Sequence, residues 1–276
     1  MLYAGIDAGS RSIKVVLYDA EKDAVVASGT VDQGVAQESL ARDLYERLLR
    51  NLGAASEEVA KVVATGYGRG AISFADTTIT EITCHARGVR HTVPEVRTII
   101  EIGGQDSKLI RLDPGGMVRD FAMNDRCAAG TGRFLEILAA RLEVPLSELS
   151  GLTERSTHPA AISSMCVVFA ETEIIGLLAV GTPPPDIVAG VQMAIVKRVV
   201  AMAGRSIESL IVFTGGVALN AGITRAIETA IGKSVHVVPD PQMTGALGAA
   251  ILAARSLEKP VVPEKLSGVG RDEFRT

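Results

Sequence analysis

The same short pattern of residues occurs twice in this chain of 276 residues. Residues 3–19 read as a strand, a glycine-containing turn and a second strand, and residues 98–113 repeat that order. Four pairs of residues align at one offset of 94: Asp7 with Glu101, Gly9 with Gly103, Lys14 with Lys108 and Asp19 with Asp113. A repeat of this kind indicates that half of the fold is duplicated, so we expect two related lobes.

The hydrophobic periodicity between these hairpins predicts the same order of elements twice. In the first half we expect a strand at 24–30, a helix at about 37–51, a strand at 59–65 and a helix near 80–91. In the second half we expect three strands between about 96 and 122, helices at 131–142, 167–179 and 186–203, a strand at 209–213, a helix at 218–230 and a last helix from about Met243. In both halves of the chain the predicted strands come first and the helices follow. This order favours an α/β fold of two lobes with a cleft between them.

Pro94 is the expected border between the lobes. We therefore divide the chain into an N-terminal lobe (1–95), a C-terminal lobe (96–258) and a tail (259–276). The tail is rich in proline, glycine and charge, which predicts a loosely held extension.

Both hairpin turns have the composition of a phosphate site. Their glycines free backbone N–H groups to converge on an anion, and Ser10, Ser12 and Gln105 can add hydrogen bonds. Lys14 is the natural counter-charge. Asp7, at the end of the first strand, is placed to hold Mg²⁺, through water because that ion keeps much of its hydration shell.

Two further glycine clusters follow in the second half. Gly215 and Gly216 lie in the cluster 212–220, after an apolar strand and before a helix that would face a phosphate with its N-terminus. In the cluster 244–250 we assign Gly245 to the ligand and Gly248 to helix packing. The chain has neither a P-loop nor a Rossmann glycine pattern, which excludes both of those nucleotide sites.

Two of the three cysteines each stand just before a run predicted to be helical. Cys127 lies in 124–134 and Cys166 in 163–171, where helix N-termini would favour negative charge. Two thiolates are half of the four that a cubane iron–sulfur cluster requires, and a two-fold dimer would complete the set. The alternative is that each cysteine is a small buried hydrophobic residue.

Composition excludes several classes of partner. The formal charge of −4 gives no overall attraction to nucleic acid or anionic lipid. We find no apolar run of about 18 residues and no targeting leader, so we expect a cytoplasmic protein that does not bind membranes or nucleic acid. A reducing compartment would leave the cysteines available for metal or redox chemistry.

Two phosphate hairpins together with a later Gly-Gly motif resemble the actin, sugar-kinase and heat-shock ATPase superfamily along most of the chain. The resemblance implies two ribonuclease-H-like lobes around a nucleotide cleft. Four motifs resemble one branch of it more closely: IGGQDSK (102–108), NDRCAAGTGRF (124–134), SSMCVVFAE (163–171) and FTGGVA (213–218).

That branch is the ATP-dependent activators of 2-hydroxyacyl-CoA dehydratases, with the ATP-binding subunits of benzoyl-CoA reductase closely related. The likeness runs from Gly5 to about Ala254 and includes the segments 64–69 and 81–86. It implies a homodimer with one [4Fe–4S] cluster at the two-fold axis, ligated by Cys127 and Cys166 of each copy. Cys84 resembles a cysteine of the family that is not a ligand, and we expect it in the core.

The resemblance further implies an ATPase coupled to electron transfer. Each cleft would bind ATP or ADP with Mg²⁺, and one low-potential electron, received from a ferredoxin or flavodoxin, would pass to a separate iron–sulfur dehydratase or reductase. We assign hydrolysis to a water positioned by Asp7 and Gln105, with Glu101 or Asp106 as further candidates, and charge stabilisation to Lys14. The nucleotide-binding residues are expected to be Gly9, Ser10, Arg11, Ser12, Gly103, Gly104, Asp106, Gly215, Gly216, Asn220 and Gly245.

Three other functions remain open from the residues. A benzoyl-CoA reductase subunit shares the same motifs, and a small-molecule kinase or a heat-shock-type regulatory ATPase shares the superfamily. The last two leave the paired cysteine motifs unexplained. The four histidines show no paired metal spacing, and we expect them to be structural or on the surface. Helices running from the cysteines to the cleft would let lobe closure change the angle between two subunits.

Overall fold

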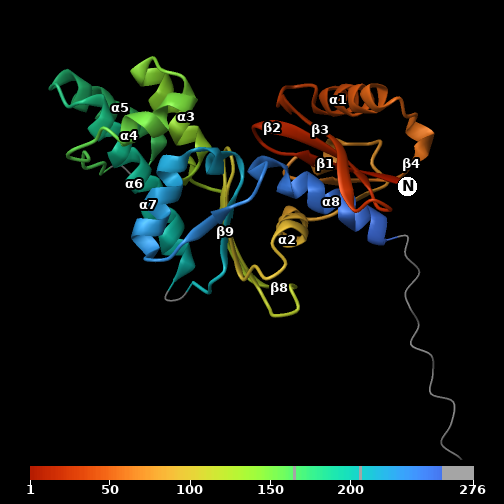
Figure 1. Cartoon of the computed structure of the whole chain (residues 1–276). Coiled ribbons are helices and arrows are strands. Elements are labelled where there is room, and N and C mark those ends of the chain that lie inside the picture. Colours follow the sequence, from red (N-terminus) through yellow and green to blue (C-terminus); the bar gives the residue numbers. More distant parts are fainter. Residues whose placement is uncertain (164–165, 205–206, 257–276) are drawn as a thin grey trace, which may run out of the picture.

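The structure, a computed structural model, describes residues 1–163, 166–204 and 207–256. It contains two five-stranded sheets with helices packed on both faces of each (Figure 1). This confirms the predicted α/β fold of two lobes. The predicted tail (259–276), and Ser164 and Met165 of one cysteine motif, lie outside the described residues.

The two sheets have the same strand order and directions, so the repeat extends over a whole sheet. The first sheet runs β3 (Ala24–Asp32), β2 (Ser12–Asp19), β1 (Leu2–Ala8), β4 (Val59–Thr65), β5 (Thr77–Thr78). The second runs β8 (Val118–Asn124), β7 (Ser107–Leu112), β6 (Thr98–Ile102), β9 (Ile211–Thr214), β10 (Val235–Val237). In each, the first three strands pair antiparallel and the last two join in parallel.

The pairing of residues across the two strands of each hairpin also follows the repeat. Asp7 on β1 lies opposite Lys14 on β2, and Glu101 on β6 lies opposite Lys108 on β7. An acid and a lysine therefore meet at the mouth of both hairpins. The two lobes present the same pair of charges to the space between them.

Successive side chains of a strand point to opposite faces of its sheet. In the central strands the side chains on both faces are apolar, so each sheet is buried on both faces. On β1, Ala4 and Ile6 pack with helix α1 (Gln37–Leu52), whereas Tyr3 packs on the other face with helix α8 (Thr244–Arg255). Gly53, with φ at 69°, ends α1 in the left-handed conformation that glycine adopts readily.

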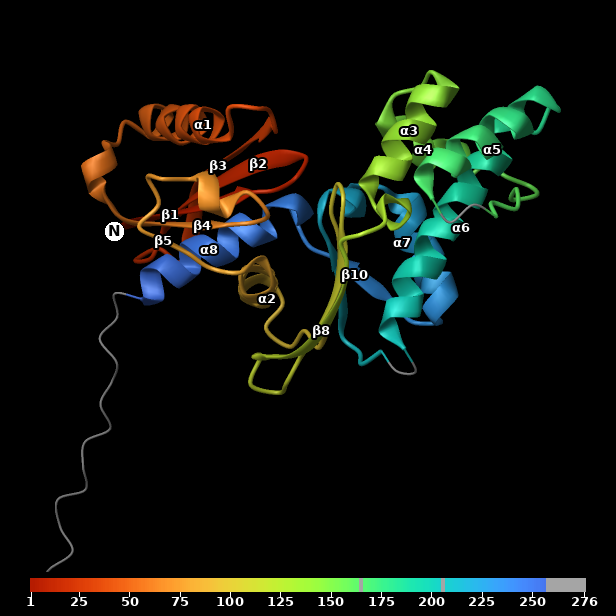
Figure 2. The ribbon, with the colours of Figure 1, turned by 180° about the vertical axis from the view of Figure 1, so that it is seen from behind.

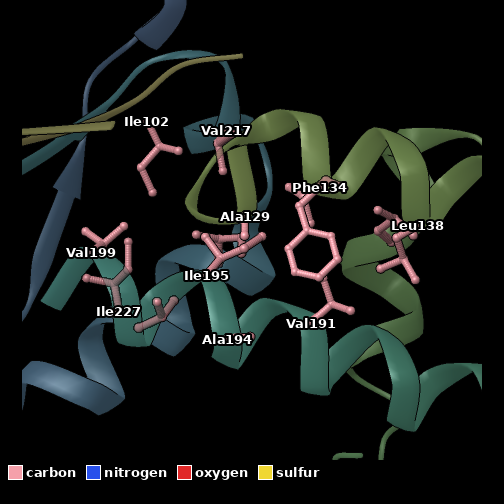
Figure 3. Close-up of a cluster of buried hydrophobic side chains, with 14 of the residues drawn as sticks. Ile102, Ala129, Phe134, Leu138, Val191, Ala194, Ile195, Val199, Val217 and Ile227 are labelled. Carbon is pink, nitrogen blue, oxygen red and sulfur yellow. The ribbon is translucent and has the colours of Figure 1, made fainter. Parts of the chain in front are cut away.

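Five helices lie on one side of the second sheet, and together with the sheet they form the largest hydrophobic core among the described residues. They are α3 (Gly132–Leu142), α4 (Leu149–Thr153), α5 (Val167–Ala179), α6 (Pro184–Ala203) and α7 (Ala221–Ile231), of which α6 and α7 pack on the strands of the sheet. Phe134 of α3 lies at the centre of this core, against Val191 and Ile195 of α6 (Figure 3). The apolar spacing along α3 and α6 predicts which face of each helix is buried. Burial of side chains of this size is the main contribution to the stability of this core.

Helix α2 (Glu81–Thr92) and α8 lie between the two sheets (Figures 1 and 2). Ala86 and Val89 of α2 pack on the second sheet, and α8 packs on the first sheet and on α2. The segment predicted as one C-terminal lobe, 96–258, therefore places its last helix against the sheet of the other lobe. The border near residue 95 remains a prediction, and these two helices are where the lobes meet.

The predicted elements agree with the structure to within a few residues. The structure adds the short strands β5 and β10 and the short helix α4, which carry too few residues to show a period. Gly216–Leu219 forms a 3₁₀ turn, and α7 begins only at Ala221. Cys127 precedes another 3₁₀ turn, Ala128–Gly130, and α3 begins at Gly132, one residue after the predicted start.

Candidate functional site

A cavity of about 490 Å³ lies where the two hairpin turns face each other. Twelve of the predicted site residues line it: Asp7, Gly9, Ser10, Arg11, Ser12, Lys14, Gly103, Gly104, Asp106, Gly215, Gly216 and Asn220. Asn220 also caps α7, because its Oδ1 accepts the N–H of Ile223 at 3.2 Å. The folded chain thus gathers side chains from three separate glycine clusters around one space.

Two predicted residues do not line this cavity. Gln105 is exposed at the tip of the second hairpin turn. Gly245 lies behind the wall, where a Cβ would come within 3.0 Å of Asp7 Oδ2 and 3.2 Å of His85 Cε1. Gly245 therefore leaves room for Asp7 and His85.

Helices α2 and α3 bring acidic and basic side chains to the cavity that the glycine motifs do not indicate. Glu81 and His85 stand one turn apart on α2, and Glu136 comes from α3. His85 was expected only to be structural or on the surface; it is buried and also lines the cavity, which the sequence did not indicate. The spacing of Glu81 and His85 on a predicted helix is the signal that could have identified them.

Lys108 is buried in a cluster of three carboxylates at the floor of the cavity. Its Nζ donates to Glu101 Oε2 and Asp106 Oδ2, both at 2.8 Å, and lies 3.7 Å from Glu81 Oε2. Burial alone would lower the pKa of Lys108, but attraction to Glu101, Asp106 and Glu81 raises it overall. Lys108 is therefore charged and fully occupied by protein carboxylates.

The pKa values of the three carboxylates around Lys108 are shifted in opposite directions. Burial tends to raise the pKa of Glu101, yet the Lys108 ammonium draws that pKa below its usual range. Burial and the neighbouring Glu101 raise the pKa of Asp106, and burial also raises the pKa of Glu81. Glu101 is thus the carboxylate that is most firmly ionised.

Lys14, the counterpart of Lys108 in the repeat, is less tightly held. Its Nζ lies 3.8 Å from Asp7 Oδ2 and donates to the carbonyl of Ser12 at 3.3 Å. Lys14 lines the cavity with one long ion pair instead of three. Of the two repeated lysines, Lys14 is therefore the one able to engage a bound anion.

His85 connects α2 to the start of α8. Its Nδ1 lies 3.0 Å from Thr244 Oγ1, which in turn lies 2.8 Å from Thr214 Oγ1 at the end of β9. Burial lowers the pKa of His85, so its ring is neutral at pH 7. These hydrogen bonds join α2, α8 and the second sheet at one point beneath the cavity.

Arg11 links the two lobes across the mouth of the cavity. Its Nε donates to Glu136 Oε1 at 2.6 Å, and attraction to that carboxylate raises the pKa of Arg11. Glu136 also accepts from Arg133, one turn earlier on α3, at 3.0 Å. A Cβ at Gly104 would stand only 2.5 Å from the Cβ of Arg11, so a glycine is required where the two turns touch.

The first turn of α3 is hydrogen-bonded to the second hairpin turn. The N–H groups of Gly132 and Arg133 donate to the carbonyls of Gly103 at 2.9 Å and Gly104 at 2.8 Å. These carbonyls belong to residues that line the cavity. The turn expected to hold phosphate and the start of α3 therefore form one hydrogen-bonded unit.

Cys127 lies five residues before the start of α3, ahead of the short 3₁₀ turn. Its N–H donates to Asn124 Oδ1 at 3.2 Å, and its carbonyl accepts from Asn124 Nδ2 at 2.8 Å. Both bonds anchor the cysteine to the end of β8. Cys127 is half-buried, with its side chain packed at the edge of the core formed by α3 and α6.

Cys166 stands at the N-cap of α5 and is exposed. The Cys166 side chain makes no capping hydrogen bond with α5, and the N-terminus of a helix favours the negative charge of a thiolate. Val168 is 67% exposed and Phe169 70%, two large apolar side chains beside the thiol. An apolar surface of this kind around a thiol fits a site that is covered by another protein chain.

Cys84 behaves differently from the other two. It is fully buried in the core between α2, α8 and the first sheet, as expected, and burial raises the pKa of its thiol to about 12. Within residues 1–163, 166–204 and 207–256, no group of three or more His, Cys, Asp or Glu is arranged to hold a metal ion. In the same part of the chain, no helix is long and apolar enough to cross a membrane.

Two lobes with matching hairpins around one cavity define a class of protein: the fold is that of the actin-like and sugar-kinase ATPases. Residues 4–253 match the BadF/BadG/BcrA/BcrD ATPase family. The chain belongs to this family of ATPases.

Known relatives agree with that assignment. The activator of lactoyl-CoA dehydratase from Anaerotignum propionicum is 46% identical over 260 residues, which cover 94% of this chain and 100% of the relative. The structure of the activator of 2-hydroxyisocaproyl-CoA dehydratase from Clostridium difficile, with bound ADPNP, is 44% identical with a TM-score of 0.88 and covers 93% of this chain and 95% of that one. A benzoyl-CoA reductase subunit from Thauera aromatica is 31% identical over 267 residues, which cover 93% of this chain and 94% of the relative.

Proposed function

We propose that this chain is an ATP-dependent activator of a 2-hydroxyacyl-CoA dehydratase. MgATP binds in the cavity between the hairpins, and two copies of the chain hold one [4Fe–4S] cluster between them. The observation that carries the proposal is the continuous hydrogen bonding from the cavity-lining Gly103 and Gly104 to the segment that follows Cys127. The names of the relatives with higher identity support the dehydratase as partner.

The cysteines fit the cluster as a half-set of ligands. Each copy would contribute Cys127 and Cys166, which gives the four thiolates that a cubane requires. When bound, the cluster would accept one electron from a ferredoxin or flavodoxin and release it to the dehydratase. The exposed apolar side chains of Val168 and Phe169 would be covered by the second copy. We place this chemistry in the cytoplasm, where thiols stay reduced.

The lining residues support specific roles in binding ATP. Backbone N–H groups of the turns at Gly9 and Gly103, with Ser10 and Ser12, would hold the phosphates, and Lys14 would balance the developing charge. Asp7 would orient Mg²⁺ through water. The adenosine would contact Gly215, Gly216 and Asn220.

The hydrolytic water would be oriented from the same end of the cavity. Asp7 and Asp106 line it directly, whereas Gln105 would have to turn inward from the tip of its hairpin. Glu101 and Asp106 both accept a hydrogen bond from Lys108 at 2.8 Å, so we favour Asp7 for this role over either of them. Slow hydrolysis without the partner is expected if docking completes the geometry.

Anaerobic reconstitution with iron and sulfide tests the proposal. We expect four iron atoms per dimer, because the cubane is shared, and loss of the cluster in both Cys127→Ser and Cys166→Ser. The buried Cys84 provides the matched control, since Cys84→Ser should leave the iron content unchanged. Colourless wild-type protein, or a full cluster in Cys166→Ser, would contradict the proposed ligand set.

The second candidate is an ATP-binding subunit of a benzoyl-CoA reductase, to which the 31% identical relative belongs by name. Isolation from the native cell under anaerobic conditions distinguishes the two. An activator should elute as a homodimer that docks only transiently on its dehydratase. Stable association with cluster-bearing subunits and a second ATPase chain would instead favour the reductase.

A further inference from the structure

Thr131 holds an unusual position between the cavity and Cys127. It is completely buried at the N-cap of α3, where a threonine ordinarily accepts a hydrogen bond from the first turn of its helix. Here the side chain makes no such cap. The first N–H groups of α3 bond to Gly103 and Gly104 instead, so the hydroxyl is released for another use.

The Thr131 hydroxyl lies within hydrogen-bond distance of two carbonyl oxygens. Thr131 Oγ1 is 3.0 Å from the carbonyl oxygen of Gly104 and 2.7 Å from that of Ala128. A hydroxyl carries one proton, so it can donate fully to only one of them at a time. Gly104 lines the cavity, and Ala128 directly follows Cys127.

We infer that Thr131 is a positioning residue that couples the occupancy of the nucleotide cavity to the conformation of the Cys127 turn. A ligand that moves the Gly104 carbonyl changes which oxygen receives the Thr131 proton. The Ala128 carbonyl accepts the Thr131 backbone N–H at 3.1 Å in either case and gains or loses the hydroxyl as a second donor, so the turn that starts at Cys127 is held more or less tightly from this side. On its other side Cys127 stays fixed to β8 through Asn124.

Neighbouring contacts make this coupling direct. Gly104 touches Arg11 of the first lobe, so closure of the lobes acts on the same carbonyl. Ala129, the next residue of the turn, packs in the core near Phe134 and Ile195 (Figure 3), which restricts the other directions in which the turn can move. The inference rests on nucleotide binding in the proposed site and does not require the cluster.

The test measures the reactivity of Cys127 in the full-length chain freed of iron. Alkylation by iodoacetamide is followed by mass spectrometry of each cysteine-containing peptide, without nucleotide, with MgADP and with Mg-ADPNP. Binding of both nucleotides is measured separately by calorimetry. Cys84, which is buried, serves as an internal control for unfolding.

In the wild type we expect ADPNP to change the alkylation rate of Cys127 by about fivefold, the ratio that corresponds to making or losing one hydrogen bond. Thr131→Val keeps the shape of the side chain and removes the hydroxyl, so the response should vanish while nucleotide affinity stays within about threefold. Thr131→Ser should restore the response. Thr229→Val, which removes a threonine hydroxyl bonded to a carbonyl inside α7, should leave it intact.

A nucleotide response that survives in Thr131→Val, or one that is absent from a wild type that binds ADPNP, overturns the inference. Loss of the response in Thr131→Ser also overturns the inference, because serine keeps the hydroxyl and the response would then depend on the methyl group of Thr131. If Thr131→Val does not fold, Thr131→Ala tests the same hydroxyl. A wild type that binds no nucleotide overturns the proposed function itself and this inference with it.

Discussion

At the scale of single residues, Lys108 is the charge on which the floor of the cavity depends. Its ammonium neutralises Glu101 and Asp106, both at 2.8 Å, in a buried setting. Removing one member of a buried ion pair leaves the other uncompensated, at a cost of about 3–5 kcal/mol. We therefore expect Lys108→Met to lower the free energy of unfolding by about that amount at pH 7.

Guanidinium unfolding followed by circular dichroism provides the measurement. Lys22→Met is the matched control, because Lys22 pairs with Asp19 at 3.5 Å on the surface, where the loss should stay below about 1 kcal/mol. The loss in Lys108→Met should shrink as the pH falls towards 5, since the unpaired carboxylates then take up protons. Equal losses in the two variants would show that the cluster is not energetically distinct.

Cys84 predicts how stability depends on alkaline pH. Its thiol has a pKa of about 12 in the folded chain and about 8.5 in an unfolded one. Between these values the unfolded state has lost a proton that the folded state keeps, so stability must fall as the pH rises. The expected slope from this group is about −1.4 kcal/mol per pH unit.

The contribution of Cys84 is isolated by comparing the wild type with Cys84→Ala from pH 8 to 11. Burial and Asp23 also raise the pKa of Tyr18, to about 12. Both proteins should therefore lose stability as the pH rises, but the wild type should lose it faster. Parallel curves would mean that the thiol is not protected by the fold.

At the scale of elements, glycines set how closely α8 packs. A Cβ at Gly248 of α8 would overlap the backbone carbonyl of Cys84 on α2, and one at Gly5 of β1 would overlap the carbonyl of Ala246. The backbones of three elements thus meet without intervening side chains. This confirms the packing role expected for Gly248 and extends it to the contact between the lobes.

Gly248→Ala should therefore be strongly destabilising. Because backbone rather than a flexible side chain stands in the way, we expect a loss of at least about 1–3 kcal/mol, the usual cost of overpacking. Gly151→Ala in α4 is the control, since its Cβ would meet nothing within 4 Å and should be neutral or stabilising by up to about 1 kcal/mol. Thermal unfolding of the two variants side by side checks the difference.

The sequence predicted the elements well because the information is local. Hairpin turns and apolar periods lie within short windows, and the offset of 94 residues identified both hairpin turns at once. Contacts between distant elements were not predicted. Glu136 approaches Arg11 from 125 positions away in the chain, and α8 lies against the first sheet despite following the second.

For the candidate site too, features encoded by local sequence were predicted, whereas those that depend on contacts between distant elements were not. The glycine motifs predicted the turns that line the cavity, because glycine permits the backbone conformations that such turns need, but they predicted fewer than half of all the lining residues. Gln105 carries a suitable amide but stands at the tip of its turn, and its direction depends on side-chain torsions that no motif encodes. The position of His85 in the cavity wall was not predicted, because only the packing of α2 between the sheets brings it there.

At the scale of the whole molecule, the ion pair between Arg11 and Glu136 joins the lobes at the cavity mouth. A bound phosphate would compete with Glu136 for the Arg11 guanidinium. Glu136→Gln removes that competition and one negative charge from the cavity. We expect it to tighten ATP binding by about fivefold, equivalent to roughly 1 kcal/mol, while changing stability little because the pair is partly exposed.

Calorimetric titration with MgATP at two salt concentrations measures this effect, which should weaken at the higher salt. Glu154→Gln is the control, because Glu154 pairs with Arg225 at 2.9 Å on an exposed surface outside the cavity lining. Unchanged or weaker binding in Glu136→Gln would mean that Arg11 does not engage the phosphates.

The position of α8 also determines when the molecule can become complete. During synthesis, residues 1–95 leave the ribosome long before residues 244–255 exist, and until then Tyr3, Val16 and Val63 lack the helix that covers them. For most of translation the first sheet therefore has one apolar face without its covering helix. Because the core of α3 to α7 contains no residue of α8, the second lobe can pack earlier, and the contact between the lobes is completed last, after residue 255 has emerged.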